Sequence, residues 1–581
     1  MTVVIDRWLR GLKRGGLGLL SVAAVYEQIG ADIPWMTYEA EEMRTTGTVL
    51  GPAYKPHRVE LESSGQRCVK LVGAGDYVEF TSTGEFDAMV LRYSLPDAPI
   101  GGGLSTRLGL FVNGERVREL PLSSRNAWLY GAYPFSNHPA QGKTRNFYDE
   151  LRLKGLKIGK NDRVKLQKIA GDGVDCVVDL VDLERVPPPI KQPEGALSVL
   201  DFGAKGDGRS DDTEPLRAVV AEAQKTGGVV WVPAGDYAIS GDIVVPSGVT
   251  IQGAGMWHTT FVGDATLYDR ADRRVRFKLT GTDVHLADFA IFGQLNYRND
   301  QEPNDGVVVA GAEDASVRRV WVEHTKAGVW VYNGVRLTIE GCRFRNLLAD
   351  GVNLCVGTSH SVVENCSARG TGDDCFAIWP APSDQGFDER AEKPGHNVIR
   401  RSTGQLTFLA NGGAVYGGAN NRIEDCLFTD IGTGCGILIS TTFPTADETG
   451  KADNNFGGRT VVEDVRLIRC GGYDHSWAWR AALQICLDRR SIAGLRIGDV
   501  EIRDSLSDAI SVVAPKEPHG GGVLSDTVLE NVRVSGVGLG TAKGRELWIR
   551  ADARGEMQVV GTPFSGVANE SAEFRIVTRP Q

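Results

Sequence analysis

The sequence has few of the features that would assign a function at first sight. Its 581 residues contain no CxxC pair and no cluster of cysteine with histidine, so they predict neither a zinc module nor a dithiol redox site. Basic residues form no run and no stripe interleaved with aromatic residues, which argues against a nucleic acid partner. No apolar run approaches the ~20 residues that a membrane-spanning helix needs. We therefore expect a folded chain with neither a nucleic acid partner nor a membrane span.

Glycine, by contrast, is abundant. The chain has 72 glycines in 581 residues, well above the average of about 7%, which predicts many tight turns. Its length exceeds what one hydrophobic core usually organises, so we expect two or more units, and its net charge of −10 assigns no partner. Four of the ten cysteines recur at the same place in similar segments, as a ladder of reduced side chains inside a repeat would: Cys342, Cys366, Cys426 and Cys470.

Residues 1–32 form a leader in which basic residues precede the mild apolar run 15–25. With Ala23 and Ala24 as small residues for cleavage, this segment is interpreted as a secretion signal, and we expect the protein to be extracellular. An amphipathic helix, or a start codon assigned too early, is the alternative, because the segment has no clean A-x-A site.

Residues 33–186 predict a β-sandwich. Short segments of alternating apolar and polar residues, broken by turn residues, recur at 76–80, 88–95, 108–114 and 163–169. That length and spacing are typical of two packed antiparallel sheets. The same region has an aromatic group that either stacks on sugar rings or fills the core: Trp128, Tyr130, Tyr133 and Phe135.

A proline-rich linker, residues 187–195, marks the boundary to a second unit that spans 196–581. Near the start of this unit, Asp212 or Thr213 is suited to cap a helix. Apolar residues then recur at helical spacing, and Gly227 follows as a helix end.

The second unit repeats itself. A turn followed by a short alternating strand recurs with its glycine at Gly306, Gly328 and Gly351, at intervals of 22 and 23 residues, and further strands run between these copies. Two or three short strands per repeat, without the 3.6-residue periodicity of helices, favour a parallel β-helix over helical repeats. The predicted fold class is therefore all-β, a β-sandwich followed by a solenoid of parallel strands.

Three aspartates lie where this repeat brings neighbouring rungs together: Asp350, Asp373 and Asp374. Asp350 and Asp373 are 23 residues apart, so we expect them at equivalent places on rungs roughly 4.8 Å apart. Carboxylates gathered in this way repel one another unless they share a proton, bind a cation or have a raised pKa. One protonated and one ionised carboxyl form the pair that glycoside hydrolysis uses. The alternative is that they are ordinary turn residues, since Asp-Gly is a common turn pair.

Over nearly its full length the chain resembles glycoside hydrolase family 87, the bacterial α-1,3-glucanases and mycodextranases. The motifs that carry the resemblance are PWMTYEAE, LRYSLPDA, WLYGAYPFSNHP, DFGAKGDGRSDDT, ADGVNL, SVVENCSARGTGDD and LANGGAVYGGANNRIEDC. The resemblance implies a right-handed parallel β-helix of the pectin-lyase type and inverting hydrolysis of α-1,3-glucan. It also implies that Asp373 is the general acid, while Asp350 and Asp374 hold and activate the water.

The opening YEAE stretch and a closing strand that contains aspartate make residues 33–186 similar to carbohydrate-binding modules of families 6 and 35. That resemblance implies a structural calcium with Glu39, Glu41 and Asp182 as ligands, since carboxylate oxygens suit Ca²⁺. Exposed acidic residues on edge strands are the alternative. No cofactor is expected for catalysis.

Residues next to the three aspartates are candidates for sugar contact. They are Trp379 and Tyr416 as stacking platforms, Asn353 and Asn411 as partners for hydroxyl groups, and Trp477 and Trp479 at the border of a cleft. Each aromatic is equally suited to a place in the core. Cys355 and Cys375, so close to the site, are unexpected in an extracellular enzyme.

Other functions stay open. Polygalacturonase-like hydrolases share the Asp then Asp-Asp arrangement, but the Gly-His-Gly and Arg-Ile-Lys with which they grip an anionic sugar are absent, which favours a neutral glucan. A lyase would use calcium and a basic residue, and neither 349–357 nor 372–380 contains lysine or arginine. The alternative from a different class is a non-catalytic solenoid that binds carbohydrate in the same groove. We expect a monomer whose partner is a polysaccharide.

Overall fold

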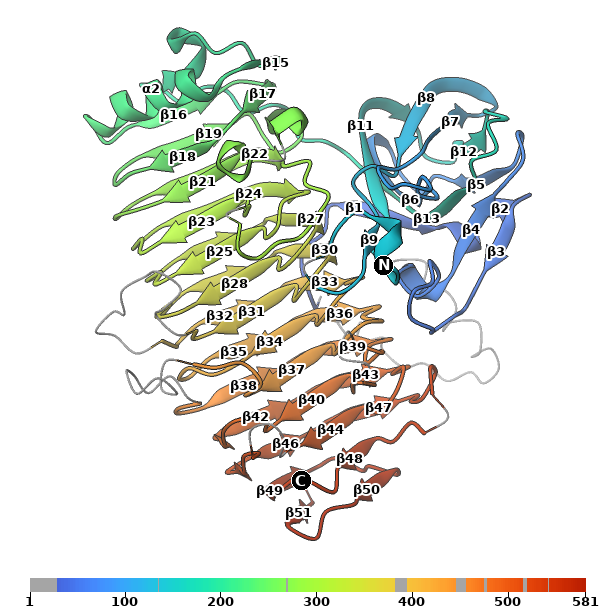
Figure 1. Ribbon diagram of the computed structural model, residues 1–581, viewed down its shortest axis with the longest axis vertical. Helices are drawn as coiled ribbons and strands as arrows, with labels where there is room; N and C mark the ends of the chain where they lie inside the picture. The colour runs from blue at the N-terminus through green and yellow to red at the C-terminus, as the bar shows by residue number, and fades with distance from the viewer. Residues whose placement is uncertain are drawn as a thin grey trace, which may run out of the picture.

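The computed structural model describes most of the chain, namely residues 29–580 without 134, 268–269, 303, 382–393, 446–455, 475–477, 516–519 and 542. In Figure 1 these residues form two units side by side, a small unit of antiparallel strands and a tall stack of parallel strands. The predicted all-β fold, a sandwich followed by a parallel β-helix, is confirmed. Most of the predicted leader lies outside the described residues, and within them no helix is long and apolar enough to cross a membrane.

Two antiparallel sheets make up the sandwich. One contains β1 (Trp35–Glu39), β3 (Thr48–Leu50), β4 (Cys68–Leu71), β6 (Phe86–Ser94), β11 (Asp149–Ile158) and β13 (Cys176–Glu184). The other contains β2 (Arg44–Thr45), β5 (Tyr77–Thr81), β7 (Ser105–Val112), β8 (Glu115–Ser123) and β12 (Arg163–Lys168). Apolar residues that alternate along the strands meet between the sheets, as Val78 and Phe80 of β5 do.

Each middle rung of the β-helix gives two short strands to one long parallel sheet and one strand to a second. The rung of Asp350 contains β26 (Thr338–Glu340), β27 (Arg343–Leu347) and β28 (Val352–Cys355). The next contains β29 (Val362–Glu364), β30 (Ser367–Thr371) and β31 (Phe376–Trp379), and is followed by β32 (Val398–Arg400), β33 (Thr403–Gln405) and β34 (Gly413–Val415). The helix predicted near Asp212 is α2 (Thr213–Gln224), which packs its apolar side on the first coils.

The pairing of β28 with β31 sets the register of the aspartates. Val352 lies opposite Phe376, so Asp374, and not Asp373, is at the place that Asp350 occupies one rung earlier. The Gly351 N–H accordingly donates to the Asp374 carbonyl at 3.0 Å. The expectation that Asp350 and Asp373 are equivalent is thus wrong by one residue. The reason is that this rung is 24 residues long, as the pairing of Arg343 with Ser367 also shows.

The cysteine ladder forms only in part. Cys342 and Cys366 stack on neighbouring rungs, Ser402 takes the next place and Cys426 the one after. Cys470 lies outside it, because the pairing of β36 (Leu427–Thr429) with β39 (Arg466–Ile468) puts Val465 in line with Cys426. All ten cysteines are buried and free.

Charged side chains that the two units bury together join the sandwich to the β-helix. Glu184 of β13 accepts two hydrogen bonds from the Arg343 guanidinium, both at 2.7 Å. Arg369 of β30 lies between Glu150 and Asp182 of the sandwich, at 2.6 and 2.9 Å. All nine residues of β13 are buried, because one face meets the sandwich core and the other meets the β-helix. These contacts help to hold the sandwich against the side of the rungs.

Candidate active site

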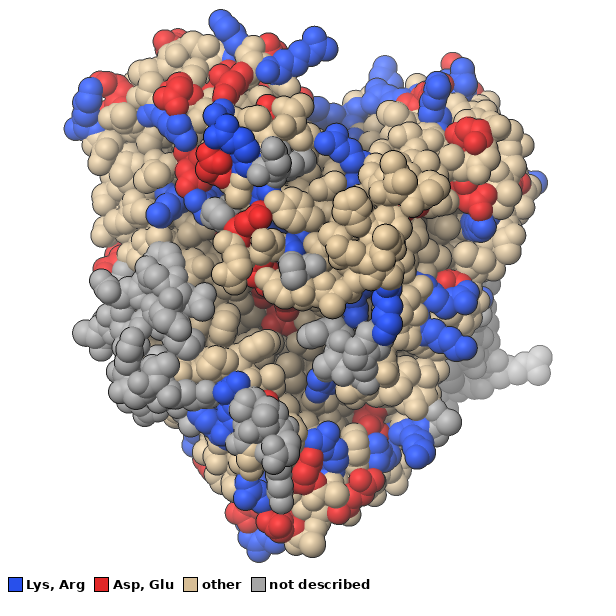
Figure 2. All heavy atoms as spheres, viewed as in Figure 1, with Lys and Arg blue, Asp and Glu red and all other residues tan. Residues whose placement is uncertain are grey.

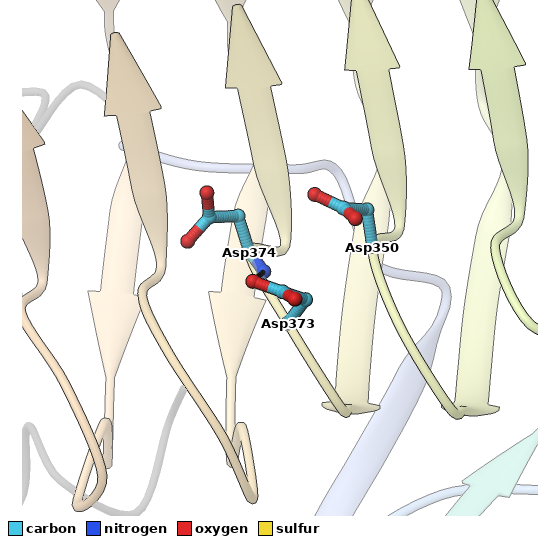
Figure 3. A group of neighbouring side chains, drawn as sticks. All are labelled: Asp350, Asp373 and Asp374. Atoms are coloured by element: carbon cyan, nitrogen blue, oxygen red, sulfur yellow. Dashed lines mark hydrogen bonds between the residues drawn. The ribbon is translucent and has the colours of Figure 1, made fainter. Parts of the chain in front are cut away.

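The three aspartates converge at the start of neighbouring strands. Figure 3 shows Asp350 and Asp374 just ahead of two adjacent strands, with Asp373 beside them. One carboxylate oxygen from each lies within 4.8 Å of the other two. Asp350 and Asp374 are buried, whereas the Asp373 side chain is 28% exposed and is therefore the accessible member of the cluster. Near the centre of the face in Figure 2, acidic side chains lie in a hollow between the two units.

Hydrogen bonds from the following rung hold Asp374. Asn411 is the residue at the same register position one rung later, and its backbone N–H and side-chain amide donate to Asp374 Oδ1 at 3.1 and 2.8 Å. The Tyr416 hydroxyl donates to Oδ2 at 2.8 Å. Both residues are buried. The structure therefore places Asn411 and Tyr416, expected as sugar contacts, as supports of an acid.

A second chain of contacts supports Asp350. The Asn353 side-chain amide donates to Asp350 Oδ1 at 3.2 Å, and the Cys355 thiol donates to Asn353 Oδ1 at 3.0 Å. Asn353 is buried and thus serves the acid, and the unexpected Cys355 has a place as the group that orients it. Trp379 is half-buried, donates from Nε1 to the Pro444 carbonyl at 3.1 Å and lies 5.5 Å from the exposed Phe443 ring.

Burial and mutual repulsion raise the pKa of the two buried acids. Burial, with the charges of Asp373 and Asp374, raises the pKa of Asp350 well above its usual range, although Arg298 opposes the shift. Burial and then Asp373 raise the pKa of Asp374 to about 7, even though hydrogen bonds from Asn411 and Tyr416 favour its ionised form. The cluster therefore holds a proton near neutral pH, shared among groups that titrate together.

The sequence patterns missed a cation in the cluster. Arg298 comes from the segment between β22 (His285–Phe292) and β23 (Val307–Ala310), and its Nη2 donates to Asp373 Oδ2 at 2.6 Å. Burial lowers the pKa of this guanidinium, but Asp373 and Asp300 outweigh burial and raise it overall, so Arg298 stays charged and is no base. A basic residue does lie beside the aspartates, so the lack of lysine and arginine in 349–357 and 372–380 is not the argument against a lyase. The argument is that Arg298 stays charged and cannot abstract a proton. The one available signal was that 293–306 interrupts the repeat.

Comparison with known proteins agrees with this geometry. Family models described as alpha-1,3-glucanase catalytic domains D1 and D2 match residues 32–186 and 211–484. The family 87 α-1,3-glucanase catalytic unit from Streptomyces thermodiastaticus strain HF3-3 is 29% identical with a TM-score of 0.78, over 95% of this chain and 97% of that one. This chain belongs to glycoside hydrolase family 87.

Other solved structures are as similar. The Agl-KA catalytic domain is 25% identical with a TM-score of 0.84, over 97% of this chain and all of that one. A family 87 catalytic domain in complex with nigerose is 25% identical with a TM-score of 0.79, over 94% of this chain and 98% of that one. Two further nigerose complexes carry alanine at aspartates that lie 24 residues apart, the interval from Asp350 to Asp374.

Curated sequences match over shorter stretches. The pre-neck appendage protein of Bacillus phage B103 is 26% identical over 230 residues, which are 38% of this chain and 25% of that one. The chain thus spans about a quarter of the length of that relative.

In this family 87 chain, the aspartate cluster is the only group of three metal-ligating side chains among the described residues whose ligand atoms lie within 4.8 Å. Arg298 donates to one oxygen of Asp373, and Asn411 and Tyr416 donate to both oxygens of Asp374. A cation would compete with these donors. The arrangement therefore suits a shared proton better than a metal ion.

The residues expected to hold calcium in the sandwich do not all come together. Asp182 accepts from Thr37 at 2.6 Å and pairs with Arg369 at 2.9 Å, so it belongs to the contact with the β-helix. Glu39 and Glu41 instead lie near Asp179, whose negative charge, after burial, helps to raise the pKa of each, to about 7 for Glu41. One oxygen of each glutamate, Oε2, is buried without a hydrogen-bond partner.

The aromatic group of the sandwich does not form an open binding face: Phe135 and Tyr133 contact the β-helix, while Trp128 and Tyr130 pack within the sandwich. Phe135 is buried with Leu348 of the acid-bearing rung, and Tyr130 is buried and donates to Asp97. Trp128 is half-buried and donates to the Leu95 carbonyl. Tyr133 alone is exposed, at 47%. Trp479 is half-buried against Tyr473, and Trp477 lies outside the described residues.

Proposed function

We propose that this chain hydrolyses α-1,3-glucosidic linkages in α-1,3-glucan, such as mutan, fungal wall glucan or nigeran-type polymers. The observation that carries the proposal is the cluster of one accessible and two buried aspartates within 4.8 Å, on the scaffold of family 87. Such a cluster can keep one carboxyl protonated while another is ionised, and hydrolysis of a glycoside needs both forms.

The roles follow from access and support. Asp373 is the accessible member and passes a proton of the coupled cluster to the glycosidic oxygen, while Asp350 and Asp374 hold and activate the attacking water. Asp350 and Asp374 occupy equivalent places on adjacent rungs, which suits two groups that share one water molecule. Inversion of the anomeric carbon is the outcome that the family resemblance implies. The acid oxygens lie within 4.8 Å of one another, closer than the roughly 6.5–9.5 Å usual for inverting pairs, so the side chains have to separate to admit the water. No cofactor takes part.

A neutral polymer fits this site better than a uronic acid polymer. All five N–H groups of Arg298 donate to protein acceptors, so this arginine offers none to a sugar carboxylate. A hydrolase that grips polygalacturonate needs a free cation beside the scissile bond. The absence of Gly-His-Gly and Arg-Ile-Lys from the sequence points the same way.

A panel of polysaccharides tests the proposal. We expect release of reducing ends from α-1,3-glucan and not from polygalacturonate, and NMR should show the β-anomer as the first product, because inversion converts the α linkage. The proposal fails if purified protein binds α-1,3-glucan and never cleaves it. Appearance of the α-anomer first would reject inversion alone.

A structural calcium in the sandwich is a further part of the proposal. The buried Oε2 atoms of Glu39 and Glu41, which have no hydrogen-bond partner, are carboxylate oxygens of the type that Ca²⁺ prefers. Bound calcium would neutralise charge that burial otherwise makes costly. We expect added Ca²⁺ to raise the Tm of the wild type and to leave that of Glu39→Gln unchanged. An equal Tm with Ca²⁺ and with chelator would remove calcium from the proposal.

The organisation that follows is a secreted monomer with a carbohydrate-binding-module-like sandwich at 33–186, a linker at 187–195 and a catalytic β-helix at 196–581. An insoluble wall polymer lies outside the cell, which supports export. Activity in the culture medium and the mass measured in solution by light scattering test export and oligomeric state.

A further inference from the structure

Arg298 uses its whole guanidinium on protein acceptors around the cluster. Nε and Nη2 donate to the two oxygens of Asp300 at 2.9 and 3.1 Å, and Nη2 also donates to Asp373 Oδ2 at 2.6 Å. Nη1 donates to the carbonyls of Gly372 and Leu348 at 2.7 and 3.3 Å. The side chain is 8% exposed. Because all its N–H groups are hydrogen-bonded and it is buried, the guanidinium is held in a single orientation.

Its acceptors belong to both turns that present the acids. Leu348 lies two residues before Asp350 on one rung, and Gly372 lies directly before Asp373 on the next. A single rigid fork therefore links the two turns and the accessible carboxylate. The second oxygen of Asp373 accepts from the Asp374 N–H at 3.2 Å, so both oxygens of Asp373 have a defined partner.

The sandwich holds the segment from which Arg298 comes. The Arg298 N–H donates to the Phe135 carbonyl at 3.1 Å, and the Asp300 N–H donates to the Tyr133 hydroxyl at 2.8 Å. Phe135 is buried in a small apolar cluster with Leu348 and Phe408 of the β-helix. The loop around Tyr133 and Phe135 thus fixes the backbone on which Arg298 and Asp300 lie.

We infer that Arg298, held in place by the Tyr133–Phe135 loop of the sandwich, is a positioning residue for the reaction, because it orients the Asp373 carboxylate and ties together the two acid-bearing turns. The sandwich is then part of the catalytic machinery and not a separable binding module. This inference rests on the proposed function. A small displacement of an acid is enough for a large effect, since about 1 Å of misplacement can lower a rate ~10²-fold.

Arg343 provides a matched control. It is also 8% exposed, comes from the β-helix and pairs with the sandwich residue Glu184 through two 2.7 Å hydrogen bonds, but within the described part of the chain it forms no hydrogen bond or ion pair with the three aspartates. Arg298→Gln, Arg298→Lys, Arg343→Gln and Arg343→Lys would be compared on soluble α-1,3-linked oligosaccharides, with the Tm of each variant measured alongside.

We expect Arg298→Gln to lower kcat about 100-fold with KM changed by less than about threefold, because ground-state binding of sugar does not involve this side chain. Arg298→Lys keeps the positive charge but lacks the planar guanidinium with its five N–H donors, so kcat should decrease less, by about tenfold. Both Arg343 variants should lower the Tm and leave kcat within about twofold of the wild type.

The pH profile separates positioning from mere folding. The titratable groups around Arg298 are four aspartates and one lysine: Asp300, Asp350, Asp373, Asp374 and Lys326. Loss of the positive charge disfavours ionised carboxylates, so the bell-shaped profile of Arg298→Gln should move to higher pH. Arg298→Lys and the Arg343 variants should keep the wild-type profile.

Two results would overturn the inference. In the first, Arg298→Gln has the same kcat as Arg343→Gln and the pH profile of the wild type. In the second, all four variants lose kcat to the same extent. If Arg298→Gln does not fold, Arg298→Lys against Arg343→Lys decides by the same comparison. A wild-type protein that cleaves no α-1,3-linked substrate would instead reject the proposed function.

Discussion

The sandwich and the β-helix each contribute a fully buried carboxylate to the centre of the molecule, and the two behave in opposite ways. Burial by itself raises the pKa of Glu150 in the sandwich, but Arg369 and Arg345 outweigh it and lower the pKa overall. Burial also raises the pKa of Asp350 in the β-helix, and there Asp373 and Asp374 add to the shift. The charge of the neighbours, and not the depth of burial, separates an acid that holds the fold from an acid that we propose takes part in the reaction.

The contacts between rungs of the β-helix also differ from the contacts between the sandwich and the β-helix. Rungs of the β-helix stack through aliphatic, aromatic and cysteine side chains, whereas the sandwich meets the β-helix through buried ion pairs around Arg343 and Arg369 in addition to small apolar clusters. Stacked apolar rungs tolerate variation in rung length. The buried pairs stabilise the docked sandwich, and removal of one partner leaves the other charge uncompensated.

The largest expected effect is loss of an acid of the β-helix. Asp373→Asn should lower kcat on α-1,3-glucan by about 10²–10⁴-fold, the usual contribution of a general acid. Glu150→Gln, a buried acid of the sandwich, should leave kcat near that of the wild type at temperatures where it is folded. The measurement is release of reducing ends. The contrast breaks down if the Glu150 variant loses as much activity as the Asp373 variant.

Removal of one partner from the interface should cost stability instead. Arg369→Ala leaves Asp182 buried without its cation and leaves Glu150 with Arg345 alone, at 3.8 Å. We expect a loss of about 3–5 kcal/mol, seen as a lower urea midpoint. Arg400→Ala removes a half-buried pair with Glu364 on the β-helix. Because Glu364 keeps Arg401 as a second partner, this should cost no more than about 1 kcal/mol. Similar losses in the free energy of unfolding for the two variants would show that the interface ion pairs stabilise the fold no more than a pair on the β-helix does.

Stability as a function of pH sharpens the comparison. Because the pKa of Asp350 is raised in the folded protein, its ionised form costs stability as pH rises through that value, and this cost is absent below pH ~4. Asp350→Asn should therefore raise the Tm at pH 8 by about 2 °C, with no gain at pH 4. Glu150→Gln should lower the Tm at pH 8. A fall in Tm for Asp350→Asn at pH 8 would contradict the assignment.

The smallest expected effects concern the cysteines. All ten are buried and free, and burial raises the pKa of Cys375 to about 12, so a thiol reagent should label none of them in the native protein and all of them after unfolding. Cys366→Ala in the ladder should cost about 1 kcal/mol without a change in kcat. Rapid labelling of the native protein would show that the rungs open.

Much of the fold was readable from the sequence because it depends on local pattern. Period-two alternation marks the strands of the sandwich, a glycine repeat of 22 to 23 residues marks the rungs, and cap residues near Thr213 mark α2. The sequence repeat was enough to find the three aspartates. Asp373 and Asp374 are adjacent in the chain, so an error of one residue in the register still places both beside Asp350. The domain boundaries and the residue roles stay predictions.

Only the tertiary structure decided what surrounds those acids. The 24-residue rung that aligns Asp374 with Asp350, the turn of Asn411 and Tyr416 toward Asp374, and the entry of Arg298 all depend on contacts between segments far apart in the chain. The buried charges of β13 are a further case, since aspartate and glutamate in a strand are expected to face water. Local periodicity determines which way a strand faces, but the partner that meets that face comes from elsewhere in the chain and leaves no mark in the local pattern.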